Sequence, residues 1–375
     1  MKKFKLLYIL NDPHPLKYFL KNHISYLNQK KQFDVTIIFN NEKNENFDEF
    51  GVKILHFPMH RRPNITKDLY CLLRLIIHLL INRYDIIHSI SPKSGLLSSI
   101  SSFLTFHGIR LHTFTGQVWA NYVGIKLYLF KTLDKLIIKL NTICLIDSFA
   151  QKNFLLENNI GNENLLCVLN NGSICGVDMT RFNIIKFKKE ELRTEFNIKR
   201  NDYVILFLGR LNFDKGVVDL YNAFKKLDDS NTHLFLVGND EENIIDYIQN
   251  DSSNLNIQFI SETKNPEKYI ALSDVLCLPS YREGFGNVVI ESASMKVPSV
   301  VSNIYGLKDS IIDGETGLYF ELGNVDMLYA KLNYLYKNKE IRLDLGNQAF
   351  EFVKLKFNSN DLSKSLYEFY RALLK

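Results

Sequence analysis

The first half of the chain alternates short apolar runs with longer amphipathic segments. The apolar runs are rich in β-branched and aromatic residues, which predicts strands at residues 4–10, 35–39, 52–57, 85–90, 109–114, 142–146 and 165–169. Between them, apolar residues recur at helical spacing, which predicts helices at residues 15–30, 66–83, 93–104, 124–140 and 148–158. Strands that alternate with helices are typical of a mostly parallel, doubly wound α/β sheet.

The alternation lapses after residue 169 and then resumes. Residues 170–178 are rich in turn formers, and the charged stretch up to Lys189 has no clear period. Further strands are predicted at residues 203–209, 232–237, 257–260, 275–278 and 298–302, and late helices at 325–337, 341–355 and 361–374. We therefore expect two Rossmann-like domains, residues 1–175 and residues 176–360, that face a central cleft. The last helix is apolar enough to dock on the rest of the chain.

Length and composition fit a soluble two-domain protein of a reducing compartment. The chain has 375 residues, enough for two cores, and its five cysteines are scattered without a Cys-x-x-Cys pair. This argues against a disulfide frame or a zinc site. Residues 1–10 lack the pattern of a secretory leader. The most apolar segment, residues 71–81, falls short of the roughly 20 residues that a spanning helix needs. We expect a cytoplasmic protein.

Charge is divided unevenly, because residues 1–180 carry a net +8 and residues 181–375 a net −3. A basic half of this kind attracts nucleic acid or an anionic membrane, or is only a solvated face. The aromatic residues lie within apolar runs rather than among lysines and arginines, which disfavours nucleic acid. We hypothesise a peripheral, membrane-facing side that carries Lys17, Lys21, Arg61, Arg62 and the Lys-rich helix 124–140.

Two cations follow the first predicted strand of the C-terminal domain. Arg210 offers a rigid fork of donors and Lys215 a mobile point charge, and both suit the oxygens of a diphosphate. Gly209 allows a close approach of the backbone, and the helix that begins at Gly216 favours an anion at its N-terminus. The alternative is a surface loop with two solvated cations.

Two carboxylates, Glu283 and Glu291, lie eight positions apart around a later turn of the same domain. Glu283 precedes the predicted helix and Glu291 lies one turn into it, so each can accept hydrogen bonds from a different set of hydroxyls. The turn between them, Gly284 to Asn287, can present the backbone amides of Phe285, Gly286 and Asn287 to a ligand. In such sheets ligands bind at the carboxyl ends of strands, so cations and carboxylates together suit a nucleotide sugar. The alternative is a solvated carboxylate at a helix start.

In the N-terminal domain, His112 lies in a strand-like run followed by Thr115, Gly116 and Trp119, the only tryptophan. A histidine at this position can donate a hydrogen bond to a sugar or phosphate, although a lone histidine is more often structural. His14 and Lys17, after the first strand, are candidates for the acceptor side together with Thr115, Gly116 and Trp119. His78 and His88 fit packing roles.

Several motifs are absent from the sequence. There is no Asp-x-Asp, no Gly-x-Gly-x-x-Gly after a strand and no Gly-Lys-Ser/Thr loop. We therefore expect no bound metal and no NAD or ATP chemistry.

At this point the chain resembles the retaining glycosyltransferases of family 4, which have the GT-B fold. The matching marks are Gly209-Arg210 with Lys215-Gly216, the Glu-x7-Glu motif of Glu283 and Glu291, Asp274 with Leu278-Pro279-Ser280, Asn171-Gly172 with Val177-Asp178, and Asp313-Gly314 with Thr316-Gly317-Leu318. The segments His112–Ala120 and Gly172–Asp178 look like the branch that extends lipid-carrier-linked glycans for bacterial capsules, O-antigens or glycoproteins. Many relatives carry a Gly-Gly loop after the first strand, where this chain has Asn11 to Pro15.

The resemblance implies a role for each site residue. Arg210 and Lys215, beside Gly209, would hold the donor diphosphate and stabilise the leaving nucleotide, so that no metal is required. Glu291 would bind the ribose hydroxyls. Glu283, with the amides of Phe285, Gly286 and Asn287, would hold the donor sugar, and His112 would contact it from the other domain. The last helix would cross back onto the N-terminal domain.

The resulting hypothesis is transfer of an N-acetylhexosamine or hexose from a UDP-sugar to a hydroxyl of a polyprenyl-diphosphate-linked glycan, with retention and front-face attack. Two alternatives stay open at this stage. One is an enzyme similar to UDP-sugar 2-epimerases, and the other is a non-catalytic scaffold with the same fold.

Overall fold

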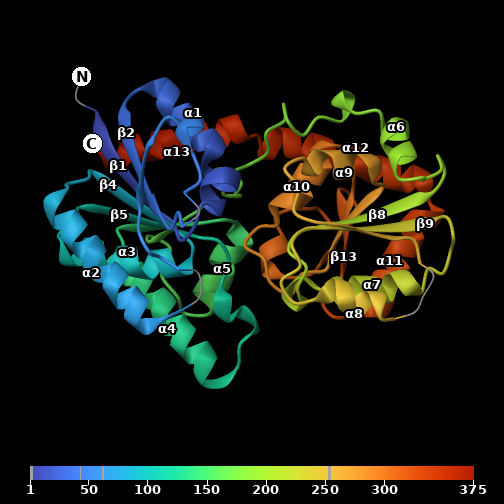
Figure 1. Ribbon diagram of the computed structural model, residues 1–375, viewed down its shortest axis with the longest axis horizontal. Helices are drawn as coiled ribbons and strands as arrows, with labels where there is room; N and C mark the ends of the chain where they lie inside the picture. The colour runs from blue at the N-terminus through green and yellow to red at the C-terminus, as the bar shows by residue number, and fades with distance from the viewer. Residues whose placement is uncertain (1–2, 43, 61–62, 252–254) are drawn as a thin grey trace. The chain divides into compact units, whose positions relative to one another are not determined.

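The computed structural model describes residues 3–42, 44–60, 63–251 and 255–375. The chain forms two compact units (Figure 1): Met1–Gly176 together with Ser359–Lys375, and Val177–Asn358. Arg61 and Arg62, two of the basic residues singled out in the sequence, lie outside the described residues. In the part that the structure describes, no helix is both long enough and apolar enough to span a bilayer.

Unit 1 is built on a seven-stranded parallel sheet with the order β3-β2-β1-β4-β5-β6-β7. The strands are β1 (Phe4–Ile9), β2 (Phe33–Phe39), β3 (Lys53–His56), β4 (Ile86–Ile90), β5 (Ile109–Phe114), β6 (Ile143–Ile146) and β7 (Leu166–Cys167). The strand order reverses between β1 and β4. In an open α/β sheet that reversal opens a crevice at the carboxyl ends of the two strands, where ligands bind.

Helices cover both faces of this sheet, because alternate residues of a strand point to opposite sides. Leu6 and Tyr8 of β1 pack with residues of α1 (Lys21–Lys30) and α13 (Ser359–Leu373). Leu7 and Ile9 pack with α2 (Ile65–Ile81) and α3 (Pro92–Leu104) on the other face. That face continues under α4 (Gly124–Leu140) and α5 (Phe149–Glu157). Figure 1 shows α1 and α13 on one side of the sheet and α2, α3 and α4 on the other.

The terminal helix α13 is fixed in unit 1 by buried polar contacts as well as apolar ones. The Tyr370 hydroxyl lies 2.6 Å from the Tyr8 hydroxyl and 2.6 Å from His88 Nδ1, and His88 Nε2 lies 2.7 Å from Thr113 Oγ1. On the same side of the sheet, His23 Nδ1 of α1 lies 2.9 Å from Ser363 Oγ of α13. His88 is thus a structural residue of the core.

Unit 2 contains a six-stranded parallel sheet with the order β10-β9-β8-β11-β12-β13, so its strand order reverses between β8 and β11. The strands are β8 (Tyr203–Leu208), β9 (Thr232–Val237), β10 (Ile257–Ile260), β11 (Val275–Leu278), β12 (Ser299–Ser302) and β13 (Gly317–Phe320). The helices are α6 (Lys189–Glu195), α7 (Val217–Lys225), α8 (Ile244–Gln249), α9 (Pro266–Leu272), α10 (Asn287–Ser294), α11 (Val325–Lys337) and α12 (Lys339–Lys356).

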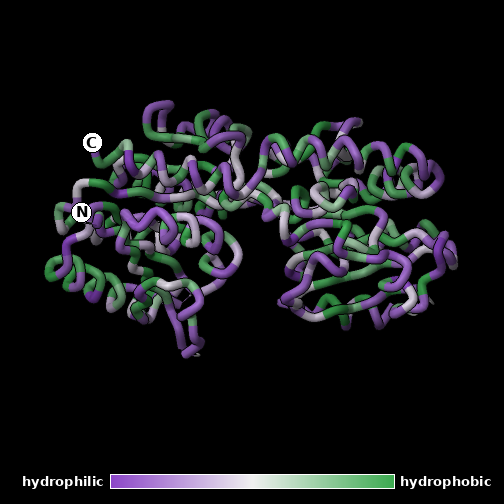
Figure 2. Tube along the Cα trace, turned by 90° about the horizontal axis from the view of Figure 1, so that it is seen from above, coloured by the Kyte–Doolittle hydropathy of each residue, from purple (hydrophilic) through white to green (hydrophobic). Residues whose placement is uncertain are grey.

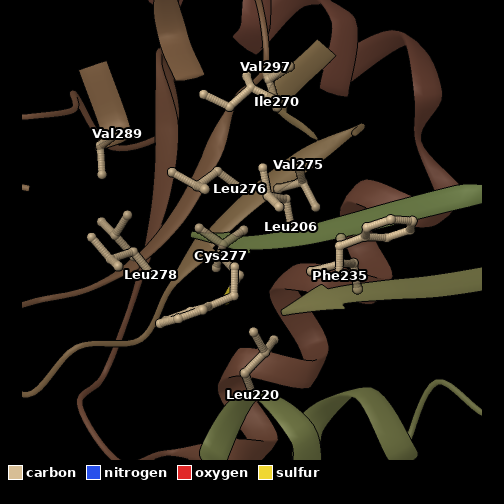
Figure 3. Close-up of a cluster of buried hydrophobic side chains, with 14 of the residues drawn as sticks. Leu206, Leu220, Phe235, Ile270, Val275, Leu276, Cys277, Leu278, Val289 and Val297 are labelled. Carbon is tan, nitrogen blue, oxygen red and sulfur yellow. The ribbon is translucent and has the colours of Figure 1, made fainter. Parts of the chain in front are cut away.

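The core of unit 2 lies where the strands meet their covering helices. Figure 3 shows Leu206 of β8, Phe235 of β9 and Leu276 of β11 within one buried cluster, with Leu220 of α7 beside them. In Figure 2 hydrophobic and hydrophilic residues alternate along the helices that cover both sheets. A helix with this alternation has one face for the core and one for solvent.

Three elements differ from the sequence-based expectation. Helix α6 was not predicted: it begins at Lys189, where the charged stretch without a clear period ends, and only one short turn of it, around Leu192 and Arg193, faces the core. Strand β13 was not predicted, since its four residues begin with a glycine and pair only with β12. The predicted helix 15–30 begins with a π-helical turn, Leu16–Leu20, before α1.

Candidate active site

The predicted cations of unit 2 follow β8, at the edge where its strand order reverses. Arg210 Nη1 donates to Glu241 Oε2 at 2.7 Å, and the side chains are 40% and 26% exposed. Glu241 also accepts from Asn212 Nδ2 at 3.0 Å. The loop after β9 therefore orients the guanidinium that follows β8 and leaves part of it accessible.

Lys215 and Glu283 lie in direct contact, although 68 positions separate them in the sequence. Lys215 Nζ donates to Glu283 Oε1 at 2.5 Å, and the two side chains are only 16% and 13% exposed. Ser280 Oγ donates to the same carboxylate oxygen at 2.8 Å. The structure thus joins one member of the predicted cation pair to one member of the predicted carboxylate pair.

Glycines make this contact possible by letting backbones approach closely. Gly216 has φ +67°, and a Cβ added there would lie 2.0 Å from the carbonyl oxygen of Pro279, in the loop that carries Glu283. Gly238, at the end of β9, approaches Gly209 in the same way, since its added Cβ would lie 1.8 Å from the Gly209 carbonyl oxygen. The ends of β8, β9 and β11 are therefore packed backbone to backbone.

In the turn between Glu283 and Glu291, Gly286 shapes the backbone and the Phe285 side chain packs in the core. Gly286 has φ +74° and precedes α10, whose first residue is Asn287. The Phe285 side chain is 2% exposed and its ring centroid lies 5.1 Å from that of Phe357, so the side chain belongs to the core. Only the backbone of Phe285 remains for the donor-binding role that the sequence suggested.

Glu291 lies one turn into α10, as predicted, and is partly buried. Burial raises the pKa of its carboxyl to about 7, and Glu267 adds to the rise while Arg181 opposes it. Arg181 and Glu267 themselves form an ion pair at 3.0 Å. Among the residues that the structure describes, no hydrogen bond or ion pair joins Glu291 to Lys215 or Glu283.

In unit 1, His112 of β5 is fully buried beneath the start of α3. Its Nδ1 lies 3.0 Å from Ser89 Oγ, which donates to the Leu111 carbonyl and so accepts from the imidazole. A Cβ added to Gly95 of α3 would lie 2.4 Å from His112 Cε1. Burial lowers the pKa of His112 to about 3, so the ring is neutral, and its buried Nε2 has no hydrogen-bond partner among the residues that the structure describes. With the proton on Nδ1, Nε2 is an acceptor.

Of the residues predicted for the acceptor side, Trp119 is buried, and the other four follow β1 or β5. Trp119 is 2% exposed, and its Nε1 donates to Asp134 Oδ2 at 2.7 Å, so this side chain packs inside unit 1. Thr115 and Gly116 lie in the loop after β5, where Gly116 has φ +97°. His14 and Lys17 follow β1; the His14 ring packs on Tyr18 and Lys17 forms an ion pair with Glu45.

Several residues that support the site were not singled out in the sequence. They are Gly238 and Glu241 after β9, and Asn11 and Gly95 in unit 1. Asn11 Oδ1 accepts from the backbone N–H of Ser94 at 2.8 Å and so joins the end of β1 to the first turn of α3. The Ser91-Pro92 pair marks the start of α3 in the sequence, but its nearness to His112 depends on the fold.

A metal site does not emerge from the part of the chain that the structure describes, where no three His, Cys, Asp or Glu side chains converge as ligands. The positive groups next to the predicted diphosphate position are Arg210 and Lys215.

Comparison with known proteins gives these residues a family context. Residues 188–352 match the family model described as Glycosyl transferases group 1. The chain is 29% identical to the capsular polysaccharide biosynthesis glycosyltransferase CapM of Staphylococcus aureus, over 95% of this chain and 94% of that protein. It is 26% identical to an Escherichia coli UDP-Gal:alpha-D-GlcNAc-diphosphoundecaprenol alpha-1,3-galactosyltransferase, over 79% and 78% of the two chains.

Among solved structures, sucrose-phosphate synthase of Thermosynechococcus elongatus aligns over 99% of both chains with a TM-score of 0.85 at 18% identity. This similarity shows the fold: two Rossmann-like units of the GT-B class. Residues 188–352 thus match the Glycosyl transferases group 1 model, within a chain that has the GT-B fold.

Proposed function

We propose that this protein is a retaining glycosyltransferase that moves an N-acetylhexosamine or hexose from a UDP-sugar to a hydroxyl of a polyprenyl-diphosphate-linked glycan. The observation that carries the proposal is the buried contact of Lys215 with Glu283 at the carboxyl ends of β8 and β11, inside the group 1 domain. A cation beside a sugar-binding carboxylate suits a ligand in which a diphosphate is joined directly to a sugar.

Arg210 and Lys215 would neutralise charge as the nucleoside diphosphate leaves. Lys215 Nζ has three donors, of which one reaches Glu283, so the others are available to phosphate oxygens. A fixed cation in a site that excludes water stabilises a developing anion strongly. These two side chains would supply the charge that a metal ion provides elsewhere, so the proposed reaction needs no metal.

The sugar and the ribose would be held by carboxylates. Glu283 would accept from sugar hydroxyls, with its orientation set by Lys215 and Ser280. Glu291 would accept from the ribose. His112 Nε2, as an acceptor, suits a sugar hydroxyl better than a phosphate oxygen.

In front-face attack the acceptor hydroxyl enters on the side from which the nucleotide leaves, and no enzyme nucleophile is needed. Glu283 is the only carboxylate here with a claim to that role. Glu283→Gln keeps a hydrogen-bond acceptor, so we expect it to retain most turnover. A fall of several orders of magnitude, with donor binding intact, would make Glu283 a nucleophile and contradict front-face attack.

The acceptor assignment draws on relatives whose names specify capsule or diphosphoundecaprenol substrates. We place the reaction at the inner face of the plasma membrane, with the protein held there peripherally. The test is incubation of the protein with a UDP-sugar and a synthetic polyprenyl-diphosphate glycan, followed by NMR of the product. We expect the H1–H2 coupling of the transferred sugar to show the same anomeric configuration as in the donor; an inverted product would overturn retention.

A further inference from the structure

Unit 1 exposes an unusual amount of apolar surface on one helical layer. Of the 25 large apolar side chains that are exposed in the described part of the chain, 15 lie between Ile65 and Leu129. They belong to α2, to the end of α3 and to the start of α4. Scattered exposed apolar residues are normal, but a concentration of this kind marks an interaction surface.

Helix α2 carries apolar residues on both of its faces. Cys71, Leu75 and Leu79 are fully buried against the sheet. On the opposite face Leu69, Leu73, Ile77 and Leu80 are each more than half exposed. A helix that is apolar all round is normally covered on every side, so the outer face of α2 needs a partner.

The exposed surface continues onto the neighbouring helices. Helix α3 packs against both α2 and α4, so the three form one layer, which we call the outer layer. Phe106, just after α3, and Val123 and Ile125, at the start of α4, are 89%, 85% and 88% exposed. Figure 1 shows the three helices side by side on the face of the sheet opposite α1 and α13.

The charge of the outer layer identifies the partner. Helices α2 and α4 carry six cations and two carboxylates in sequence: Lys67, Arg74, Lys126, Lys131, Lys135 and Lys139 against Asp68 and Asp134. Asp68 is paired with Lys93, and Asp134 is buried against Trp119. The surface that remains is apolar and cationic, which is the composition of helices that lie in an anionic bilayer interface. Two copies placed face to face would bring like charges together.

We propose that the outer layer of α2, α3 and α4 is a lipid-binding face that inserts apolar side chains into the interface of an anionic bilayer. The proposal rests on the proposed function, in which the acceptor is carried by a membrane lipid. This proposal differs from the sequence-based hypothesis, in which lysines attract the protein to the membrane. Lys17 and Lys21 lie with α1 on the other side of the sheet from α4, so these lysines and those of α4 do not share one face. Insertion of apolar groups persists in salt, whereas attraction between exposed charges is screened within about 3 Å at 1 M salt.

The test is flotation of the full chain with phosphatidylethanolamine vesicles that contain phosphatidylglycerol. The variant Leu69→Gln/Leu73→Gln/Ile77→Gln removes three exposed apolar side chains and leaves the buried face of α2 unchanged. The matched control is Ile341→Gln/Leu343→Gln/Leu355→Gln, which changes three exposed apolar residues of α12. We expect the α2 variant to bind at least tenfold more weakly in both 0.1 M and 1 M NaCl, and the α12 control to bind like the wild type.

Three results would overturn the proposal: an α2 variant that binds like the wild type, wild-type binding that vanishes in 1 M NaCl, or a wild-type dimer that only the α2 variant dissociates. UDP release with a water-soluble acceptor separates this proposal from the transferase. A wild-type protein that does not float with the vesicles but still releases UDP refutes only the lipid-binding face. Flotation without UDP release from any donor refutes only the transferase.

Discussion

The Lys215–Glu283 contact places a cation and a carboxylate where neither is well solvated. Deleting one side chain of such a pair leaves the other charge without compensation, whereas Glu283→Gln keeps an oxygen that accepts from Lys215 Nζ. Arg210 differs, because its side chain is more exposed and its partner Glu241 lies after the neighbouring strand. Lys215 is therefore the residue on which leaving-group stabilisation should depend most.

We expect Lys215→Ala to lower kcat by roughly 10²–10³-fold, the effect typical of removing one donor that stabilises a developing anion. The measurement is steady-state UDP release. Lys225→Ala is the matched control, since Lys225 ends α7 on the surface, away from the site, and pairs with exposed Asp251. A Lys215→Ala enzyme within threefold of the wild type would contradict the assigned role.

The raised pKa of Glu291 predicts that donor binding depends on pH. Because burial raises its pKa to about 7, the carboxyl is mostly protonated at pH 6 and mostly ionised at pH 8. An ionised carboxylate is the better acceptor for ribose hydroxyls, so KM for the UDP-sugar should fall as pH rises through 7. The Glu291→Gln variant should show a flat profile over this range. The same slope in variant and wild type would assign the titration to another group.

The burial of individual side chains could not be predicted from the residue pattern. The positions of Arg210, Lys215, Glu283 and Glu291 after strands followed from periodicity and glycine placement. In contrast, the burial of the Trp119 and Phe285 side chains in the cores was not visible from the sequence, and the donor-binding role of the Phe285 amide stays a prediction. The tautomer of His112 depends on Ser89, which lies on the adjacent strand and is related to His112 only by the register of β4 and β5.

At the scale of elements, the strand ends of unit 2 are held together by glycines. The strands β8 and β9 begin and end within about one residue of the predicted positions, because each is a strong apolar run. The close approach of Gly216 to Pro279 and of Gly238 to Gly209 was not predictable, since it joins segments 63 and 29 positions apart. These contacts arise only when the sheet order is formed.

Gly216→Ala should therefore disturb donor binding more than an ordinary glycine substitution does. Its Cβ would collide with the Pro279 carbonyl and displace the loop that carries Glu283. Gly314→Ala is the control, because Gly314 also has a positive φ but has open space around its Cβ position. Calorimetry should show UDP binding weakened at least tenfold for Gly216→Ala and little changed for Gly314→Ala. Equal effects would mean that backbone strain alone matters.

At the scale of the whole molecule, the end of the chain completes the first unit. Two doubly wound sheets could be predicted from alternation, and so could a docked last helix. The buried chain of Tyr8, Tyr370 and His88 could not, because it links residues more than 280 positions apart. Ser359–Lys375 is thus required for the core of unit 1.

Tyr370→Phe should destabilise unit 1 by roughly 1–3 kcal/mol, since it leaves His88 Nδ1 and the Tyr8 hydroxyl buried without this partner. Trp119, the only tryptophan, is buried in unit 1 and reports its unfolding in urea by fluorescence. The control is Tyr334→Phe, at an exposed position of α11. Equal midpoints for Tyr370→Phe and the wild type would show that the hydroxyl chain contributes nothing.

The central claim is metal-independent transfer from a UDP-sugar to a lipid-linked acceptor. Its most direct test is release of free UDP from a panel of UDP-sugars in EDTA, with and without a lipid extract that contains polyprenyl-diphosphate glycans. The account predicts release that depends on one sugar and on the extract, and that Lys215→Ala lowers by roughly 10²–10³-fold. Release that requires added divalent metal, or no release from any UDP-, GDP- or dTDP-sugar, would contradict it.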